Sequence, residues 1–125
     1  MLATRTMSAV AAVLVTLFAA PVHAQTYPDK IIKMIVPAPP GGQTDVMARY
    51  LAQKIEPGLG QKIIIENRPG AGGATGAKNA ATSDPDGYTL FFGNTSTLAV
   101  IPAVSKIAGY DPVKDFAPVA SVSES

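Results

Sequence analysis

The sequence predicts an α/β fold in which a mainly parallel β-sheet is the middle layer of a three-layer sandwich. Three short apolar runs are each followed by a polar or glycine-rich loop and then by a helical pattern. Strands that alternate with helices over short links form parallel sheets with right-handed crossovers and helices on both faces. With 47% hydrophobic and 15% charged residues, the chain has enough apolar side chains for such a core.

The first unit begins with the run IIKMIV at residues 31–36, which is a predicted strand. The loop PAPPGGQ separates it from a predicted helix at residues 44–56, where apolar side chains recur at the spacing of one helical face. Pro57 and Gly58 are expected to stop this helix.

The second and third units repeat this order. KIIIE at residues 62–66 is a predicted strand, followed by the bare loop NRPGAGG and an alanine-rich helix at residues 74–82. After the turn SDPDG, a third strand is predicted at residues 88–93, and a weakly helical stretch then runs to about Ser105.

Residues 1–24 are predicted to be a secretory signal peptide. Arg5 precedes an almost purely apolar run at residues 9–20, and VHA at residues 22–24 supplies the compact residues that a signal peptidase needs. The run is shorter than the roughly 20 apolar residues of a membrane-spanning helix, and an uncleaved anchor is the alternative. If cleavage falls after Ala24, it removes His23, the sole histidine, and a histidine-based triad or metal site is then excluded from the remaining segment.

Composition excludes several classes of site. The chain has no cysteine, which rules out disulfides, thiolate metal sites and cysteine nucleophiles. Ten basic and nine acidic residues are scattered without a run of one sign, so a nucleic-acid partner is not expected. The acidic residues lack metal-ligand spacing, and GAGGATG from Gly70 breaks the dinucleotide fingerprint at Thr75. We expect no metal, no cofactor and no catalytic residue.

The polar and glycine-rich loops form the candidate site. In open α/β sheets, ligands lie outside the carboxyl ends of the strands, where helix N-termini offer unpaired N–H groups that favour anions. Each loop also has a purely structural alternative. Gly41 and Gly42 can permit a tight strand-to-helix link. Gly76 can be a close packing contact, Arg68 a solvated side chain, and NTS at residues 94–96 a helix cap.

Four blocks of sequence resemble one family. They are YPDKIIKMIVPAPPGGQTDVMARYLAQKI, LGQKIIIENRPGAGGATGAKNAA, PDGYTL and YDPVKDFAPVA. Their order and spacing resemble the tripartite tricarboxylate transporter substrate-binding receptors, the Bug or TctC family of bacterial periplasmic proteins. The resemblance implies a receptor with the type II periplasmic binding protein fold, and not an enzyme. Such a receptor captures small organic carboxylates in the periplasm, delivers them to membrane permease subunits, and is expected to be monomeric.

The resemblance also implies which residues meet the ligand. Backbone amides of two loops would hold one ligand carboxylate, partly through ordered water, and a third loop would approach the cleft. The implied ligand-binding residues are Pro40, Gly41, Gly42, Ala71, Gly72, Gly73, Thr95 and Ser96. Structural or capping roles are implied for Thr44, Asp45, Asn67 and Pro69, with Thr44 as the expected N-cap. We expect a bulky residue at Gly42 or Gly73 to abolish carboxylate binding and to leave the fold intact.

Family members are about two typical domains long, so residues 25–125 are expected to be the N-terminal part of the first of two lobes. They would supply one wall of the cleft, and the second lobe is expected to lie outside this sequence. Two other functions remain alternatives. One is a secreted α/β enzyme that acts on an anionic substrate, and the other is a sensor subunit that presents a bound solute to a signalling partner.

Overall fold

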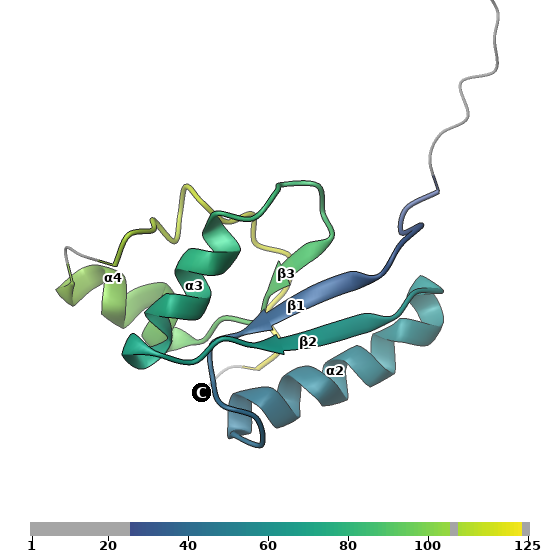
Figure 1. Cartoon of the computed structure of the whole chain (residues 1–125), viewed down its shortest axis with the longest axis horizontal. Coiled ribbons are helices and arrows are strands. Elements are labelled where there is room, and N and C mark those ends of the chain that lie inside the picture. Colours follow the sequence, from purple (N-terminus) through teal and green to yellow (C-terminus); the bar gives the residue numbers. More distant parts are fainter. Residues whose placement is uncertain (1–25, 106–107, 124–125) are drawn as a thin grey trace, which may run out of the picture.

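The alternation of strands and helices is confirmed by the structure, a computed structural model that describes residues 26–105 and 108–123. The predicted signal peptide lies outside the described residues. In chain order the elements are β1 (Ile32–Val36), α2 (Gln43–Leu59), β2 (Ile63–Asn67), the short 3-10 helix η1 (Ala71–Gly73), α3 (Ala74–Ala81), β3 (Thr89–Phe91), the π-helical turn η2 (Ser96–Val100) and α4 (Ile101–Val104) (Figure 1).

The sheet is parallel throughout, with the strand order β2-β1-β3. Ile32 is opposite Ile63 on β2, and Met34 lies between Ile65 on one side and Leu90 on the other. Because β1 is central, the loop that follows it lies between the loops that follow β2 and β3. This order places the three predicted loops along one edge of the sheet.

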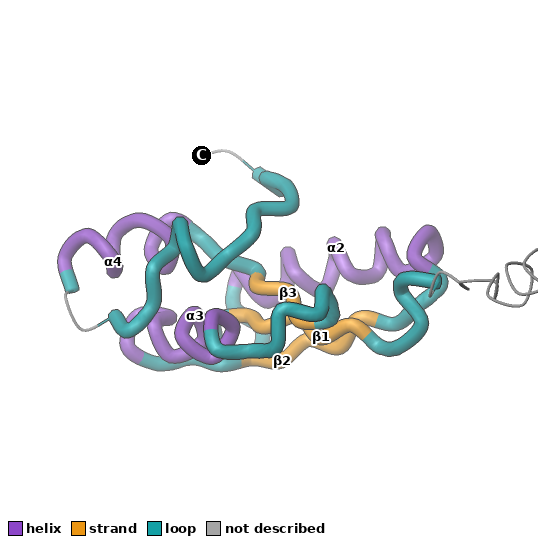
Figure 2. The backbone as a smooth tube through the Cα atoms, turned by 90° about the horizontal axis from the view of Figure 1, so that it is seen from above, coloured by secondary structure: helices purple, strands orange, loops and turns teal. Residues whose placement is uncertain are grey.

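Helices cover both faces of the sheet, as predicted. Ile32, Met34 and Val36 face α2 and form the main core with Ala48 and Ala52. Successive side chains of a strand alternate between the two faces, so Ile35, which is 0% exposed, points to the other face. There α3 contacts β1 and β3. The two helices lie on opposite sides of the strands in Figure 1, and Figure 2 shows the same elements from above.

The end of α2 differs from the prediction. The helix passes through Pro57 and ends at Leu59, so the expected stop after residue 56 is wrong. Pro57 lacks only its own N–H donor, and the helix continues to Leu59, after which Gly60 supplies the left-handed C-cap with φ 70°. Strand β3 is shorter than predicted, and the last helical stretch ends at Val104. Within residues 26–105 and 108–123, no helix has the length and apolar character to cross a membrane.

Candidate functional site

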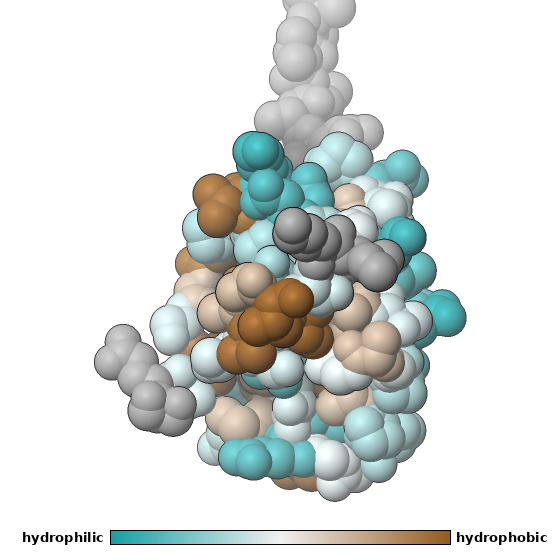
Figure 3. Space-filling model, turned by 90° about the vertical axis from the view of Figure 1, so that its left-hand side faces the viewer, coloured by the Kyte–Doolittle hydropathy of each residue, from teal (hydrophilic) through white to brown (hydrophobic). Residues whose placement is uncertain are grey.

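Three loops meet at the carboxyl edge of the sheet. The first loop (residues 37–42) follows β1, the second loop (residues 68–73) follows β2, and the third loop (residues 92–95) follows β3. Gly73 of the second loop lies against both neighbours, because a Cβ placed there would be 3.2 Å from Pro37 Cβ in the first loop and 2.6 Å from Thr97 Cγ2 in η2, just after the third loop. Figure 3 looks onto this edge, where weakly coloured residues surround a brown apolar patch.

Two amides of the first loop are occupied within the loop itself. Gly41 N–H donates to Asp45 Oδ2 at 2.8 Å, and Gly42 N–H donates to the Pro39 carbonyl at 3.2 Å. Both N–H groups therefore already have an acceptor, and the ligand contact that the resemblance implies for Gly41 and Gly42 stays a prediction. Pro40 is exposed beside them.

The amides at the start of α2 offer an alternative. Gly42 occupies the N-cap position in an extended conformation, so the expected N-cap role of Thr44 is wrong. The helical bonds begin with Val46 N–H, which donates to the Gly42 carbonyl at 2.9 Å. In the described part of the chain, no acceptor receives the N–H groups of Gln43 and Thr44, and no side chain caps this end. Sequence reasoning did not single out Gln43 because it expected the helix to begin one residue later.

The second loop presents two further amides. Gly73 N–H bonds to the Gly70 carbonyl at 2.8 Å, so it is not available. Among the described residues, Ala71 and Gly72 have no acceptor for their N–H groups. Both residues have positive φ, 48° for Ala71 and 68° for Gly72. A positive φ is uncommon in alanine, and residues that adopt such backbone conformations often lie at functional sites.

Two residues of the second unit match the structural alternatives. A Cβ at Gly76 would lie 2.7 Å from the Arg68 carbonyl, so the interpretation of Gly76 as a close packing contact is confirmed. The Arg68 side chain is half-exposed and pairs with Glu66 at 3.2 Å, as a solvated side chain would. Pro69 is exposed next to it.

The third loop is held by a small hydrogen-bonded turn. Asn94 N–H donates to Thr97 Oγ1 and Thr97 N–H donates to Asn94 Oδ1, each at 3.0 Å. Tyr110 OH fixes the same turn by donating to the Thr97 carbonyl at 2.6 Å. The turn leaves Thr95 and Ser96 exposed at its outer side. Sequence reasoning named those two residues but missed Thr97, which is 0% exposed and orders the loop.

A buried carboxylate connects the first loop to the end of β2. Asp45 is 2% exposed and accepts hydrogen bonds from Gly41 N–H at 2.8 Å, Arg49 Nε at 3.0 Å and Asn67 Nδ2 at 2.8 Å. The bond from Arg49, followed by those from the Gly41 amide and Asn67, lowers the pKa of Asp45 from 3.8 to about 2. The carboxylate is therefore ionised at neutral pH. Sequence reasoning missed Arg49, although its spacing of four residues from Asp45 is a recognisable signal.

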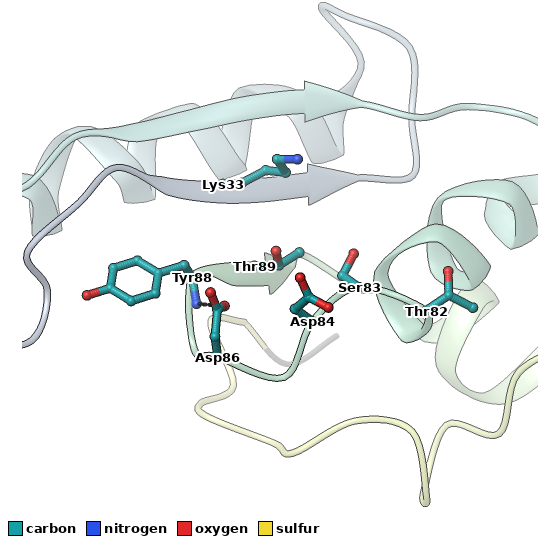
Figure 4. Close-up of a pocket in the computed structure, with 7 residues that line it drawn as sticks. All are labelled: Lys33, Thr82, Ser83, Asp84, Asp86, Tyr88 and Thr89. Carbon is teal, nitrogen blue, oxygen red and sulfur yellow. Dashed lines mark hydrogen bonds between the residues drawn. The ribbon is translucent and has the colours of Figure 1, made fainter.

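A polar groove of about 340 Å³ lies away from these loops. It is lined by Lys33, Thr82, Ser83, Asp84, Asp86, Tyr88 and Thr89 (Figure 4). The Asp86 carboxylate in it accepts the Tyr88 N–H at 2.9 Å and the Lys30 ammonium at 3.1 Å. The groove lies near the start of β3 and after the end of α3, so it is not part of the carboxyl-edge site. In the part of the chain that the structure describes, no three histidine or acidic side chains group as metal ligands.

Comparison with known proteins identifies relatives along most of the chain. Residues 47–125 match the tripartite tricarboxylate transporter family receptor, TctC. Protein BugT of Bordetella pertussis is 48% identical over 107 residues, which cover 85% of this chain and 33% of BugT. A UPF0065 protein of Bordetella bronchiseptica is 42% identical over 112 residues, which cover 90% of this chain and 33% of that protein. The chain thus spans about a third of the length of these curated relatives.

Solved structures show the same fold. MatC of Rhodopseudomonas palustris, solved with bound malate, is 40% identical, with a TM-score of 0.71 over 74% of this chain and 32% of MatC. An R. palustris protein solved with adipate is 34% identical, with a TM-score of 0.66 over 70% of this chain and 29% of that protein. A structure described as a periplasmic transporter is 52% identical, with a TM-score of 0.69 over 70% of this chain and 30% of that protein. The chain therefore belongs to the tripartite tricarboxylate transporter receptor family.

Proposed function

We propose that this chain contributes one wall of the binding cleft of a periplasmic receptor for small organic carboxylates. Dicarboxylates, tricarboxylates and related acids form the ligand class. The receptor delivers them to the membrane permease subunits of a tripartite transporter and reaches the periplasm through the leader at residues 1–24. Family membership supports the proposal, as do the malate and the adipate in two solved relatives.

The observation that carries the proposal is that four backbone amides at the carboxyl edge have no acceptor among the described residues. The N–H groups of Ala71 and Gly72 lie in the second loop, and those of Gln43 and Thr44 lie at the start of α2. A helix N-terminus carries about half a positive charge, which favours a carboxylate. The proposed site therefore holds its anion with peptide dipoles.

Two arginines lie near the proposed site, but we do not assign the binding of the ligand carboxylate to them. Arg49 pairs with Asp45 at 3.0 Å, and Arg68 pairs with Glu66 at 3.2 Å. An arginine that already pairs with a carboxylate attracts a second anion less strongly than an unpaired arginine does. We therefore assign the ligand contacts to the amides of Ala71 and Gly72 and to the first turn of α2. Thr95 and Ser96 provide contacts that depend on the acid bound.

A thermal-shift screen of the complete protein that carries this sequence tests the proposal. Dicarboxylates, tricarboxylates, amino acids and aromatic acids are compared. At a ligand concentration of 100 Kd, a binding acid should raise the free energy of unfolding by about 2.7 kcal/mol. The acid should be recovered chemically intact, and binding should survive a strong chelator. The proposal fails if no acid in the screen stabilises the protein or if the bound acid is consumed.

Replacing Gly42 by leucine should weaken acid binding at least about tenfold, a loss of about 1.4 kcal/mol. A Cβ at this position would lie 3.2 Å from the Pro39 carbonyl, so the first loop must shift beside the first turn of α2. The backbone of Gly42, with φ −70° and ψ 161°, suits any residue, so the fold should persist.

Gly58→Leu is the matched control for this change. Gly58 lies near the opposite end of α2, and a Cβ there would meet no atom within 4 Å. Isothermal titration with malate and adipate should give the same Kd for this variant as for the unaltered protein. Equal affinities of the two leucine variants would remove Gly42 from the site.

A further inference from the structure

The Asp45 carboxylate binds the glycine-rich end of the first loop directly and is connected to the beginning of that loop through Asn67. Its Oδ2 atom accepts the Gly41 N–H, and its Oδ1 atom accepts Asn67 Nδ2 at 2.8 Å. The same Asn67 Nδ2 atom donates to the Ala38 carbonyl at 3.0 Å. The carboxylate and the amide side chain therefore fix both ends of the loop segment from Ala38 to Gly41.

Arg49 closes this network on its outer side. Its Nε atom donates to Asp45 Oδ2 at 3.0 Å, and its Nη2 atom donates to Asn67 Oδ1 at 3.1 Å. Asp45 and Asn67 are thus each held by two partners or more. Removal of one member of such a network leaves polar groups of the others without a partner, which is costly in a buried place.

Arg49 also balances a charge. The Asp45 carboxylate is buried at the start of α2, where we place the bound anion. Two negative charges close together repel, and this repulsion is stronger away from bulk water. The guanidinium of Arg49 neutralises the carboxylate, so the first loop can be anchored by a charge without repelling a ligand carboxylate.

We propose that Asp45, Arg49 and Asn67 are positioning residues that lock the first loop onto the end of β2 and so hold the start of α2 and the second loop in one fixed geometry. This inference rests on the proposed function. The network touches no ligand itself. It acts through the amides of α2 and of the second loop, because Asn67 immediately precedes the second loop.

A second carboxylate on α2 provides a matched control. Glu56 accepts the Ile63 N–H at 2.8 Å and the Lys62 ammonium at 3.0 Å, so it also ties the helix to a backbone amide of the next element. It does so at the start of β2, away from the three loops. A change at Glu56 therefore measures the effect of losing such a tie on the fold alone.

The central experiment compares Asp45→Asn with Glu56→Gln in the complete protein, by isothermal titration with malate and adipate. Three donors converge on Asp45, and an amide side chain offers one acceptor oxygen, so at least one donor must face the new NH₂ group. Asp45→Asn should raise Kd about tenfold or more. Glu56→Gln should leave Kd within about twofold, which is well under the tenfold step of 1.4 kcal/mol. Hydrogen exchange of the Gly41 amide should accelerate in Asp45→Asn alone.

A second variant covers the case in which Asp45→Asn does not fold. Arg49 is half-exposed, with 52% of its side chain accessible, so Arg49→Gln should fold. It leaves the Asp45 charge without its counter-ion, so affinity for malate should fall most at low ionic strength and recover partly as salt screens the repulsion. A role confined to fold stability would not produce this salt dependence of Kd.

The outcomes separate this inference from the proposed function. If the unaltered protein binds neither these two acids nor any other acid in the screen, both proposals are overturned. If it binds, and Asp45→Asn and Arg49→Gln bind with unchanged Kd at all salt concentrations, the positioning role alone is overturned. A loss of affinity in these variants that Glu56→Gln does not share supports it.

Discussion

Gly73→Ala is expected to destabilise the protein and to remove carboxylate binding together. Gly73 has φ 106°, which is costly for any residue with a side chain. A Cβ there would also lie 2.6 Å from Thr97 Cγ2, 3.2 Å from Pro37 Cβ and 3.3 Å from the Pro37 carbonyl. Backbone strain costs about 1–3 kcal/mol, and overpacking of a buried contact costs about 1–3 kcal/mol more.

The contacts of Gly73 lead us to expect a loss of stability, whereas the sequence alone led us to expect that a side chain at this position leaves the fold intact. Gly73 is buried where the second loop contacts Pro37 and Thr97, so a side chain there separates the elements that build the site. Urea denaturation followed by circular dichroism measures the loss of stability. Gly60→Ala is the control, since Gly60 has φ 70° and no atom lies within 4 Å of its Cβ position. If both variants lose the same stability, the close contact at Gly73 has no effect.

Ile35→Ala should lower the free energy of unfolding by about 2–5 kcal/mol, the usual cost of truncating a buried isoleucine. Ile35 is 0% exposed on the central strand, so the cavity cannot be filled by water or by a surface side chain. Kd for malate should stay the same at temperatures where the variant is folded, because Ile35 belongs to no loop at the carboxyl edge.

Ile64→Ala is the matched control for this change. Ile64 lies on the neighbouring strand β2 and is 51% exposed, so its truncation should cost far less. Denaturant unfolding of the two variants gives the comparison. Equal losses would contradict the placement of Ile35 between the sheet and α3.

Much of the fold follows from local patterns in the sequence. The runs IIKMIV and KIIIE have the β-branched character of buried parallel strands, and both strands form within one residue of their predicted starts. The resemblance to the tripartite tricarboxylate transporter receptors is confirmed by the match over residues 47–125. The limits of α2 were less predictable, because the capping geometry of Gly42 and Gly60 decides them rather than the composition of its ends.

The candidate site, too, could be predicted only in part from the sequence. The glycines mark the loops by their composition alone, but which of their amides are occupied depends on acceptors elsewhere. Gly41 donates to Asp45, whose carboxylate in turn needs Asn67, 22 residues further along the chain. The sequence alone therefore does not show that the amides of Gly41, Gly42 and Gly73 already have acceptors within the protein.

The sequence by itself determined the order of strands and helices, the bare loops after each strand and the receptor family. The tertiary structure alone decided the strand order β2-β1-β3, the contact of Gly73 with Pro37 and Thr97, and the burial of the Asp45 carboxylate among three donors. The physical reason is the range of the forces involved. Backbone preferences and side-chain periodicity act over a few neighbouring residues, whereas the packing and hydrogen bonds of a site join residues that only the folded chain brings together.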